Sequence, residues 1–330
     1  MADRFGRRRV ILVSLSLYVL ASAGCALATG FQGFLLARIV QGLAASGGFI
    51  AGRAMIRDAH DAEGAHRAMS QVTLVFALAP AIAPLLGGWL HDHLGWRSVF
   101  WFLTGWGVLL AGLVLSIEET LARAHRRSLH PGAVFRSYRD MLSNGRFLRL
   151  ILSLAFAFAG LFLFIVGAPT VIYDFLKLGA SDFGLQFIPM VGGMMAGAWL
   201  TGWLADRWPI RRTAFLGLAL SAVAALLNLS LAASVEAGAL AVIAPLVLYA
   251  FGFAIAMPAT TILILDCFPR QRGAAASMQG FLQMLTNAGV ASLAVPLLHA
   301  QWLYFALGQC LFLLAGWLLW LTLPRTPAPL

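Results

Sequence analysis

Long uncharged stretches recur along the whole chain, and short polar segments separate them. Nine stretches contain no Asp, Glu, Lys, Arg or His: Val10–Ala37, Ala68–Leu90, Ser98–Ile117, Leu150–Tyr173, Phe183–Ala205, Thr213–Val235, Ala237–Leu265, Gly273–Leu298 and Ala300–Pro324. Each is long enough for a helix that crosses a bilayer, which takes about 20 residues. After the turn-like Gly30–Gly33, the segment Phe34–Ala54 supplies one more span. The pattern therefore predicts about ten spanning helices.

These runs predict helices and not the strands of a membrane barrel. A backbone inside the bilayer must satisfy its own N–H and C=O groups, which only helices and closed barrels achieve. Barrel strands would alternate polar and apolar residues at every second position, and these runs do not. The chain is 61% hydrophobic and only 11% charged, whereas an ordinary soluble domain is roughly a quarter charged. The predicted fold class is an all-α, multi-pass membrane protein.

The net charge of +10 has a topological explanation. When successive loops are assigned to alternate sides of the membrane, 20 of the 23 Lys and Arg residues fall on one side. Only Arg97 and Lys177 fall on the other side, and Arg38 lies inside a span. This positive-inside bias places the basic loops and both termini in the cytoplasm. A nucleic-acid partner, which such a charge would suggest in a soluble protein, is therefore not expected.

Two short segments are repeated along the chain. The segment Asp3-Arg4-Phe5-Gly6-Arg7-Arg8 returns 203 residues later as Asp206-Arg207-Trp208-Pro209-Ile210-Arg211-Arg212, and Gly64–Gln71 is echoed by Gly273–Gln279. Each copy of the first segment comes directly before a predicted span. We therefore expect two related halves: residues 1–117 with four helices and residues 150–330 with six, joined by a polar cytoplasmic linker over residues 118–149.

The first half lacks counterparts of the two helices that precede the repeated segment in the second half. Apolar runs at about Phe147–Tyr173 and Phe183–Ala205 come before Asp206, whereas almost nothing comes before Asp3. By comparison with the second half, we expect about 60–70 further residues upstream of Met1, with two apolar runs. An upstream coding sequence without such runs would contradict this expectation.

The repeated segment resembles the loop signature Gly-x-Leu-x-Asp-Arg-x-Gly-Arg-Arg of the major facilitator superfamily. The resemblance implies a twelve-helix plan that this chain enters at the third helix, and a loop that latches the cytoplasmic gate. A plain positive-inside cluster is the alternative, although it does not account for Asp and Gly at matching places. The residues that carry the match are Asp3, Arg4, Gly6, Arg7, Arg8, Asp206, Arg207, Arg211 and Arg212.

A second resemblance centres on the one basic residue inside a predicted span. The sequence Arg38-Ile39-Val40-Gln41-Gly42 resembles the fourth-helix motif Arg-x-x-Gln-Gly of the same family. A guanidinium in the bilayer costs at least ~2.5 kcal/mol, so Arg38 is expected to face a partner or a wet cavity and to serve proton or substrate coupling. Arg38 lies about one turn from the outer end of the span, so the alternative is that it extends its guanidinium to the interface.

A proline- and glycine-containing segment points to one branch of the family. Pro80, Pro84, Gly87 and Gly88 resemble the fifth-helix motif Gly-Pro-x-x-Gly-Gly of the drug/proton antiporters, with Ala83 at a position where the family has Gly. Proline bends a span, and paired glycines let a neighbouring backbone approach. Together with Arg53–Asp58, Gly95–Phe102 and Ser277–Gln283, the segment is most similar to the bicyclomycin/chloramphenicol resistance group of efflux carriers.

The span Gly273–Leu298 carries a polar stripe at intervals of three and four residues, formed by Gln279, Gln283, Thr286 and Asn287. In lipid such a stripe must face protein or water. It is expected either to line the translocation cavity or to form hydrogen bonds between helices. In the span Phe183–Ala205, the glycines Gly192, Gly193 and Gly197 are predicted to make close helix contacts.

The resemblance implies a proton-driven exporter of small amphipathic drugs that works by alternating access. We expect a monomer in the bacterial inner membrane, surrounded by lipid, with no cofactor, no metal and no catalytic residues. No Asp or Glu lies deep in a predicted span, since Asp266 and Glu236 are at the ends. The family commonly has its coupling carboxylate in the first helix, so we expect this 330-residue chain to couple protons poorly. The remaining alternatives are a metabolite importer, a membrane-embedded enzyme and a truncated remnant without transport activity.

Overall fold

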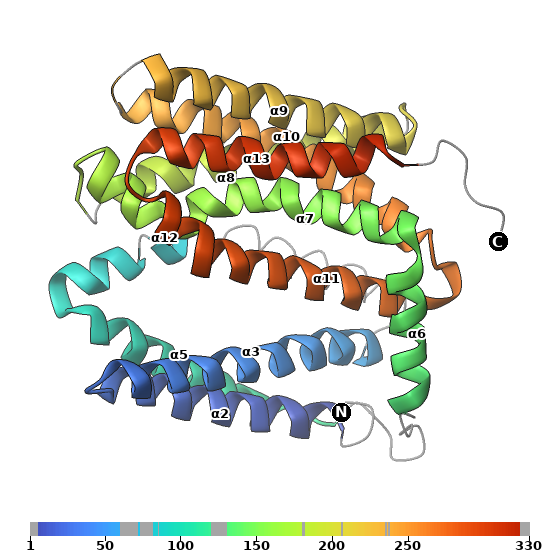
Figure 1. The fold of residues 1–330 in the computed structure, drawn as a ribbon. Helices are drawn as coiled ribbons and strands as arrows, with labels where there is room; N and C mark the ends of the chain where they lie inside the picture. The colour runs from blue at the N-terminus through green and yellow to red at the C-terminus, as the bar shows by residue number, and fades with distance from the viewer. Residues whose placement is uncertain are drawn as a thin grey trace. The chain divides into compact units, whose positions relative to one another are not determined.

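The computed structural model describes residues 6–59, 72, 82–84, 86–119, 131–179, 182–205, 207–234, 236 and 238–323. Apart from short turns, this part of the chain is helical (Figure 1). The helices are α2 Arg7–Leu27, α3 Phe31–Ala59, α5 Trp96–Leu115, α6 Pro131–Ser143, α7 Gly145–Val166, α8 Phe183–Ala205, α9 Ile210–Ser234, α10 Ala239–Leu265, α11 Arg272–Gly289, α12 Val295–Leu298 and α13 Trp302–Leu321. Wider π-type turns, η2 Thr170–Phe175 and η5 Val290–Ala294, extend α7 and join α11 to α12, and η4 Pro269–Gln271 precedes α11.

Within the described residues, eight helical segments are long and apolar enough to cross a membrane. They are α2, α5, α7, α8, α9, α10, the continuous segment Arg272–Leu298 and α13. The predicted span Phe34–Ala54 lies inside α3, which is 29 residues long. Most of the predicted span Ala68–Leu90 lies outside the described residues, although residues 82–84 and 86–94 are helical. The chain breaks between α2 and α3 as predicted, but the break falls at residues 28–30, earlier than the predicted Gly30–Gly33, and Gly33 lies inside α3.

The chain divides into an N-terminal unit, residues 1–130, and a C-terminal unit, residues 131–330. The two units repeat the same local plan. Helices α2 and α9 begin at residues 7 and 210, which are 203 residues apart, and α3 and α10 begin at residues 31 and 239, which are 208 apart. Helix α2 packs against α3 and α5, and α9 packs against α10 and α13. The internal repeat in the sequence therefore corresponds to a repeat in helix packing.

Helix α6 lies inside the segment predicted as a linker and belongs to the C-terminal unit. It runs crosswise at the ends of α7 and α11 and packs against both (Figure 1). Met141 is its anchor, because this side chain is fully buried in the core of the C-terminal unit. Asn144 then separates α6 from α7 and accepts a hydrogen bond from the Phe147 amide, which caps the start of α7.

Helix α10 is held between α8 and α9 by backbone-to-backbone contact at glycines. A Cβ atom at Gly193 would lie 2.7 Å from the Val247 carbonyl oxygen, and one at Gly197 would collide with the Phe251 carbonyl oxygen. On the other side, a Cβ at Gly217 would lie 2.6 Å from the carbonyl oxygen of Gly252. These contacts confirm the prediction for Gly193 and Gly197. A Cβ at Gly192 would meet no described atom within 4 Å, so its predicted close contact remains a prediction.

Candidate functional site

The first copy of the repeated loop segment forms the start of α2. Asp3 and Arg4 lie outside the described residues. Gly6 occupies the N-cap position with φ of 98°, a backbone conformation that strongly favours glycine. The amide groups of Arg7 and Arg8, left without partners inside the helix, donate to the Glu119 carboxylate at 2.8 and 3.2 Å. Glu119 thus places a negative charge at the positive end of the α2 dipole.

Helices α2 and α5 brace each other at both ends. The Arg8 side chain donates to the carbonyl oxygens of Val114 and Leu115, at 3.3 and 2.7 Å, where α5 ends. Arg97, near the start of α5, donates to the carbonyl oxygens of Ala26 and Ala28, at 3.0 and 3.1 Å, where α2 ends. Each guanidinium sits at the negative end of the partner's helix dipole. Within the N-terminal unit, the motif residue Arg8 is therefore part of a helix brace.

We expect Glu119→Ala to lower the free energy of unfolding by about 0.5–1 kcal/mol, because α2 loses its N-terminal cap. The thermal unfolding midpoint of the purified protein in detergent measures this loss. The adjacent, exposed Glu118 offers a matched control, since Glu118→Ala removes the same charge without removing the cap. Equal midpoints for the two variants would contradict the proposed capping of α2 by Glu119.

The second copy of the segment ends α8 and begins α9. Asp206 lies outside the described residues. The Arg207 guanidinium donates to the Trp203 carbonyl oxygen at 2.6 Å and stacks over the Trp203 ring at 4.2 Å, so it caps the end of α8. The Arg212 amide donates to the Pro209 carbonyl oxygen at 2.8 Å in the first turn of α9, and Arg211 is half-buried beside it. The gate role of both copies remains a prediction.

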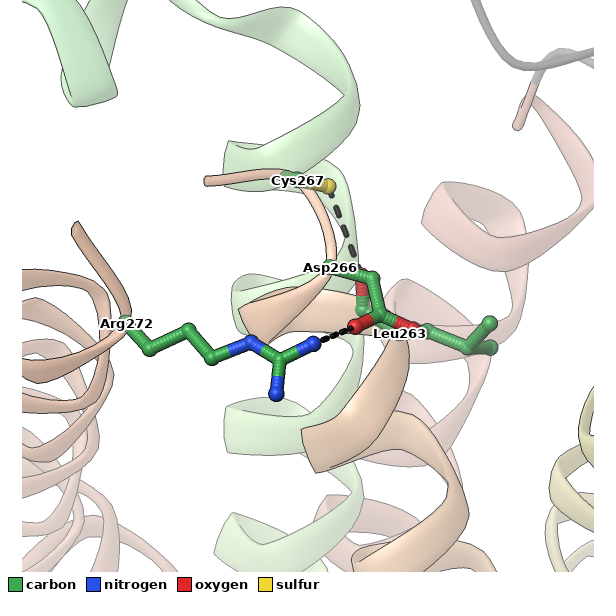
Figure 2. Close-up of polar contacts among 4 residues, drawn as sticks. All are labelled: Leu263, Asp266, Cys267 and Arg272. Atoms are coloured by element: carbon green, nitrogen blue, oxygen red, sulfur yellow. Dashed lines mark hydrogen bonds and ion pairs between the residues drawn. The ribbon is translucent and has the colours of Figure 1, made fainter. Parts of the chain in front are cut away.

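The turn between α10 and α11 carries an exposed ion pair. Figure 2 shows the Arg272 guanidinium donating to the Asp266 carboxylate at 2.9 Å. Beside it, the Cys267 thiol donates to the Leu263 carbonyl oxygen at 3.4 Å. Burial raises the pKa of the Cys267 thiol, although nearby Arg146 acts in the opposite direction. Asp266 directly follows α10, so its carboxylate lies at a helix end, as the sequence predicted.

Arg38 is the charged centre of a hydrogen-bond chain between α3 and α2. Its guanidinium donates to the Gln41 side-chain oxygen at 2.5 Å. The Gln41 side-chain amide donates to the Ser22 hydroxyl at 2.7 Å, and that hydroxyl donates to the Tyr18 carbonyl oxygen at 2.7 Å. Gln41 is 3% exposed and Ser22 is fully buried. The predicted pair Arg38 and Gln41 therefore meets, whereas the predicted Gly42 is exposed and a Cβ there would meet no described atom within 4 Å.

An aromatic cluster of Phe34, Trp96 and Phe100 lies beside Arg38. The Arg38 guanidinium carbon lies 5.8 Å from the centre of the Phe100 ring, within the range of a cation–π contact. Phe34 packs edge-on against Phe100 and Trp96, with ring centres 5.4 and 5.8 Å apart. Helix α3 begins at Phe31, so Arg38 lies about two turns inside it. Its hydrogen bond to Gln41 leads further into the helix, away from its start.

The polar stripe on α11 divides into two kinds of contact. Gln279 donates to the Thr261 hydroxyl of α10 at 3.0 Å, a bond between helices. Gln283 donates to the Asn287 side-chain oxygen at 3.2 Å on its own helix, and Asn287 is buried. Of the three residues, only Asn287 is buried, and Gln279 and Gln283 are partly exposed. The interhelical alternative thus holds for Gln279, and a cavity role for Gln283 and Asn287 remains a prediction.

The antiporter-type segment is described only in part. Pro80 lies outside the described residues, and Pro84, Gly87 and Gly88 lie in the helical residues 82–84 and 86–94. A Cβ at Gly87 would meet no described atom within 4 Å, so the predicted close approach remains a prediction. Within the described part of the chain, no cluster of three or more His, Cys, Asp or Glu side chains could hold a metal ion.

Sequence patterns missed three residues that the structure places around the predicted ones. Glu119 belongs to the polar segment after α5, and nothing in that segment indicates the start of α2 as its partner. Arg97 was identified as one of two basic residues on the outer side and as part of a resemblance, but its capping of α2 could be seen only in the fold. Ser22 was a weak signal, because it is one of several hydroxyl-bearing residues in the run Val10–Ala37, although a polar residue inside a span indicates a buried partner.

Known proteins match this chain over most of its length. Residues 1–294 match the Major Facilitator Superfamily model. The multidrug transporter MdfA of Shigella boydii is 28% identical over 337 residues, which cover 98% of this chain and 78% of that protein. A bicyclomycin resistance protein homolog of Haemophilus influenzae is 27% identical over 199 residues, 60% of this chain and 50% of that protein.

The solved structure of a D-xylose–proton symporter shares the fold, with a TM-score of 0.77 at 18% identity over 98% of this chain and 82% of that chain. These matches confirm the all-α, multi-pass membrane fold and the resemblance to the drug/proton antiporter branch. They also confirm a transporter of small molecules and not an enzyme. The family match covers far more than half of the sequence, and the chain therefore belongs to the Major Facilitator Superfamily.

Proposed function

We propose that this protein exports small amphipathic drugs from the bacterial cytoplasm in exchange for protons. The observation that carries the proposal is the 28% identity to a multidrug transporter along 98% of the chain. The similarity to a bicyclomycin resistance protein homolog supports the same substrate class. The protein acts as a monomer in the inner membrane, with the proton gradient as its energy source and without a cofactor.

Charge placement supports the proposed orientation, in which both termini face the cytoplasm. In the C-terminal unit, the starts of α7, α9 and α11 and the end of α8 lie at the same end of the bundle (Figure 1). Six arginines occupy these helix ends: Arg146, Arg149, Arg207, Arg211, Arg212 and Arg272. Lys177 follows η2 at the opposite end. This end of the C-terminal unit is therefore proposed to be the cytoplasmic one.

Arg38 is the proposed coupling group of the N-terminal unit. Its hydrogen bond to Gln41 directs the guanidinium into the span, which favours a transport role over extension to the outer interface. Gln283 and Asn287 are proposed to line the substrate path in the C-terminal unit, and the repeated Asp-Arg loops are proposed to close the cytoplasmic gate. Alternating access then consists of rocking movements of the two helix bundles about the bound drug.

Drug accumulation in a bacterial strain without its own major drug exporters tests this function. Cells that express the protein should accumulate less chloramphenicol than cells with an empty vector, and a protonophore should remove the difference. Unchanged accumulation would contradict drug export, and increased accumulation would indicate import. Export that persists with the protonophore would contradict proton coupling.

A further inference from the structure

Ser22 is fully buried in α2, one helix away from Arg38. Its hydroxyl has one proton, which it donates to the Tyr18 carbonyl oxygen at 2.7 Å. The hydroxyl oxygen can therefore only accept from a second partner. The Gln41 amide supplies that donor at 2.7 Å. Ser22 thus uses its only donor on Tyr18, and toward Gln41 it can act only as an acceptor.

The two hydrogen bonds of Ser22 fix the orientation of the Gln41 amide. An amide side chain can present either its NH₂ group or its oxygen to a neighbour, and the hydrogen-bond network decides between them. Because Ser22 accepts, the NH₂ group must face Ser22, and the oxygen faces Arg38. Arg38 has only donors, so both neighbours require the same orientation. Gln41 is 3% exposed, and solvent does not compete for these groups.

The guanidinium of Arg38 is then restrained on two sides. Gln41 accepts from one of its N–H groups at 2.5 Å, and the Phe100 ring covers it at 5.8 Å. A guanidinium is planar and has five N–H groups in a fixed fork. Fixing one N–H direction and one face therefore fixes the direction of the other donors. Arg38 itself is exposed within its unit.

We propose that Ser22 is a positioning residue for transport: through Gln41, it sets the direction in which Arg38 presents its remaining N–H groups. The proposal rests on the proposed function, in which Arg38 acts in transport. Ser22 touches neither the drug nor Arg38, and its effect passes through the Gln41 amide. Without its hydroxyl, the buried NH₂ group of Gln41 loses its acceptor and the amide is free to turn. Arg38 then loses a fixed partner, and drug is bound less well.

The test is chloramphenicol transport by the purified full chain in proteoliposomes, with KM and kcat measured per folded molecule. Ser22→Ala is expected to raise KM about tenfold with a smaller change in kcat. Ser22→Thr keeps the hydroxyl and is expected to restore most of the affinity. Ser14→Ala is the matched control, because Ser14 is a buried serine of α2 that packs against Gly47 of α3 and takes no part in the described hydrogen-bond chain from Arg38 through Gln41 to Ser22. Its KM should equal that of the unaltered protein.

A double variant separates positioning from simple packing. If Ser22 acts through Arg38, Ser22→Ala should change KM little once Arg38→Lys is present, because the two effects are not additive. Equal KM values for the unaltered protein and Ser22→Ala would overturn the inference, as would full additivity with Arg38→Lys. If Ser22→Ala does not fold, Ser22→Cys replaces it and carries the same expectation. An unaltered protein that transports no drug would defeat the proposed function, whereas a failure confined to the Ser22 variants would defeat this inference alone.

Discussion

Arg38→Ala is expected to reduce drug export strongly while leaving a folded protein. Arg38 is the only basic residue between Phe34 and Gly52, and its hydrogen bond to Gln41 is charge-assisted. Bonds of this kind contribute about 1.5–3 kcal/mol each, so the loss of one transport contact corresponds to about a 10- to 100-fold fall in kcat/KM. Chloramphenicol transport in proteoliposomes measures this fall directly.

Arg38→Lys is the informative companion of this variant. It keeps the positive charge but replaces the planar fork with a compact ammonium group. Transport between that of Arg38→Ala and the unaltered protein would show that both charge and shape are used. Size-exclusion profiles in detergent control for folding. Transport by Arg38→Ala at the level of the unaltered protein would support the other explanation, in which the side chain only extends to the interface.

Gly193→Ala is expected to cost about 1–3 kcal/mol of stability, because it adds an atom where two helices meet by their backbones. The new Cβ would lie 2.7 Å from the Val247 carbonyl oxygen and 3.0 Å from a methyl carbon of Val247. A backbone carbonyl cannot move aside as a side chain can, so α8 and α10 must separate. The thermal unfolding midpoint in detergent should fall, with a smaller yield of monodisperse protein.

Gly192→Ala is the matched control for this prediction. The two glycines are neighbours on α8, but Gly192 is exposed and its Cβ would meet no described atom within 4 Å. Replacing an exposed helical glycine with alanine is expected to stabilise the helix by roughly 0.5–1 kcal/mol. The two substitutions should therefore shift the midpoint in opposite directions. A shift of the same sign and size would contradict the described packing of α8 on α10.

Sequence patterns predicted the spans well because the bilayer imposes a length and a polarity on them. The break between α2 and α3, although earlier than predicted, and the starts of α2 and α9 followed from uncharged runs and repeated charged loops. These features depend on neighbours in the sequence. Asp3, Arg4, Pro80 and Asp206 lie outside the described residues, and their predicted roles remain predictions.

Partners across helices could not be predicted from one sequence. Glu119 caps a helix that begins 112 residues earlier, and Ser22 binds Gln41 on the next helix. Such pairs depend on how far each helix is rotated about its axis. The same rotation decides that Gly193 faces α10 while Gly192 faces away. A pattern of apolar residues that covers the whole circumference of a helix carries little information about this rotation.

The hydrogen bonds that join α2 and α5 at both ends limit how the N-terminal unit can deform. Hydrogen bonds of Arg8 and Glu119 join the start of α2 to the end of α5. Hydrogen bonds of Arg97 join the start of α5 to the end of α2. Sliding one helix along the other by a single turn, about 5.4 Å, would break the hydrogen bonds at both pairs of ends at once. Axial slippage of this pair is thus the costly movement, and the two helices travel together when the transporter changes shape.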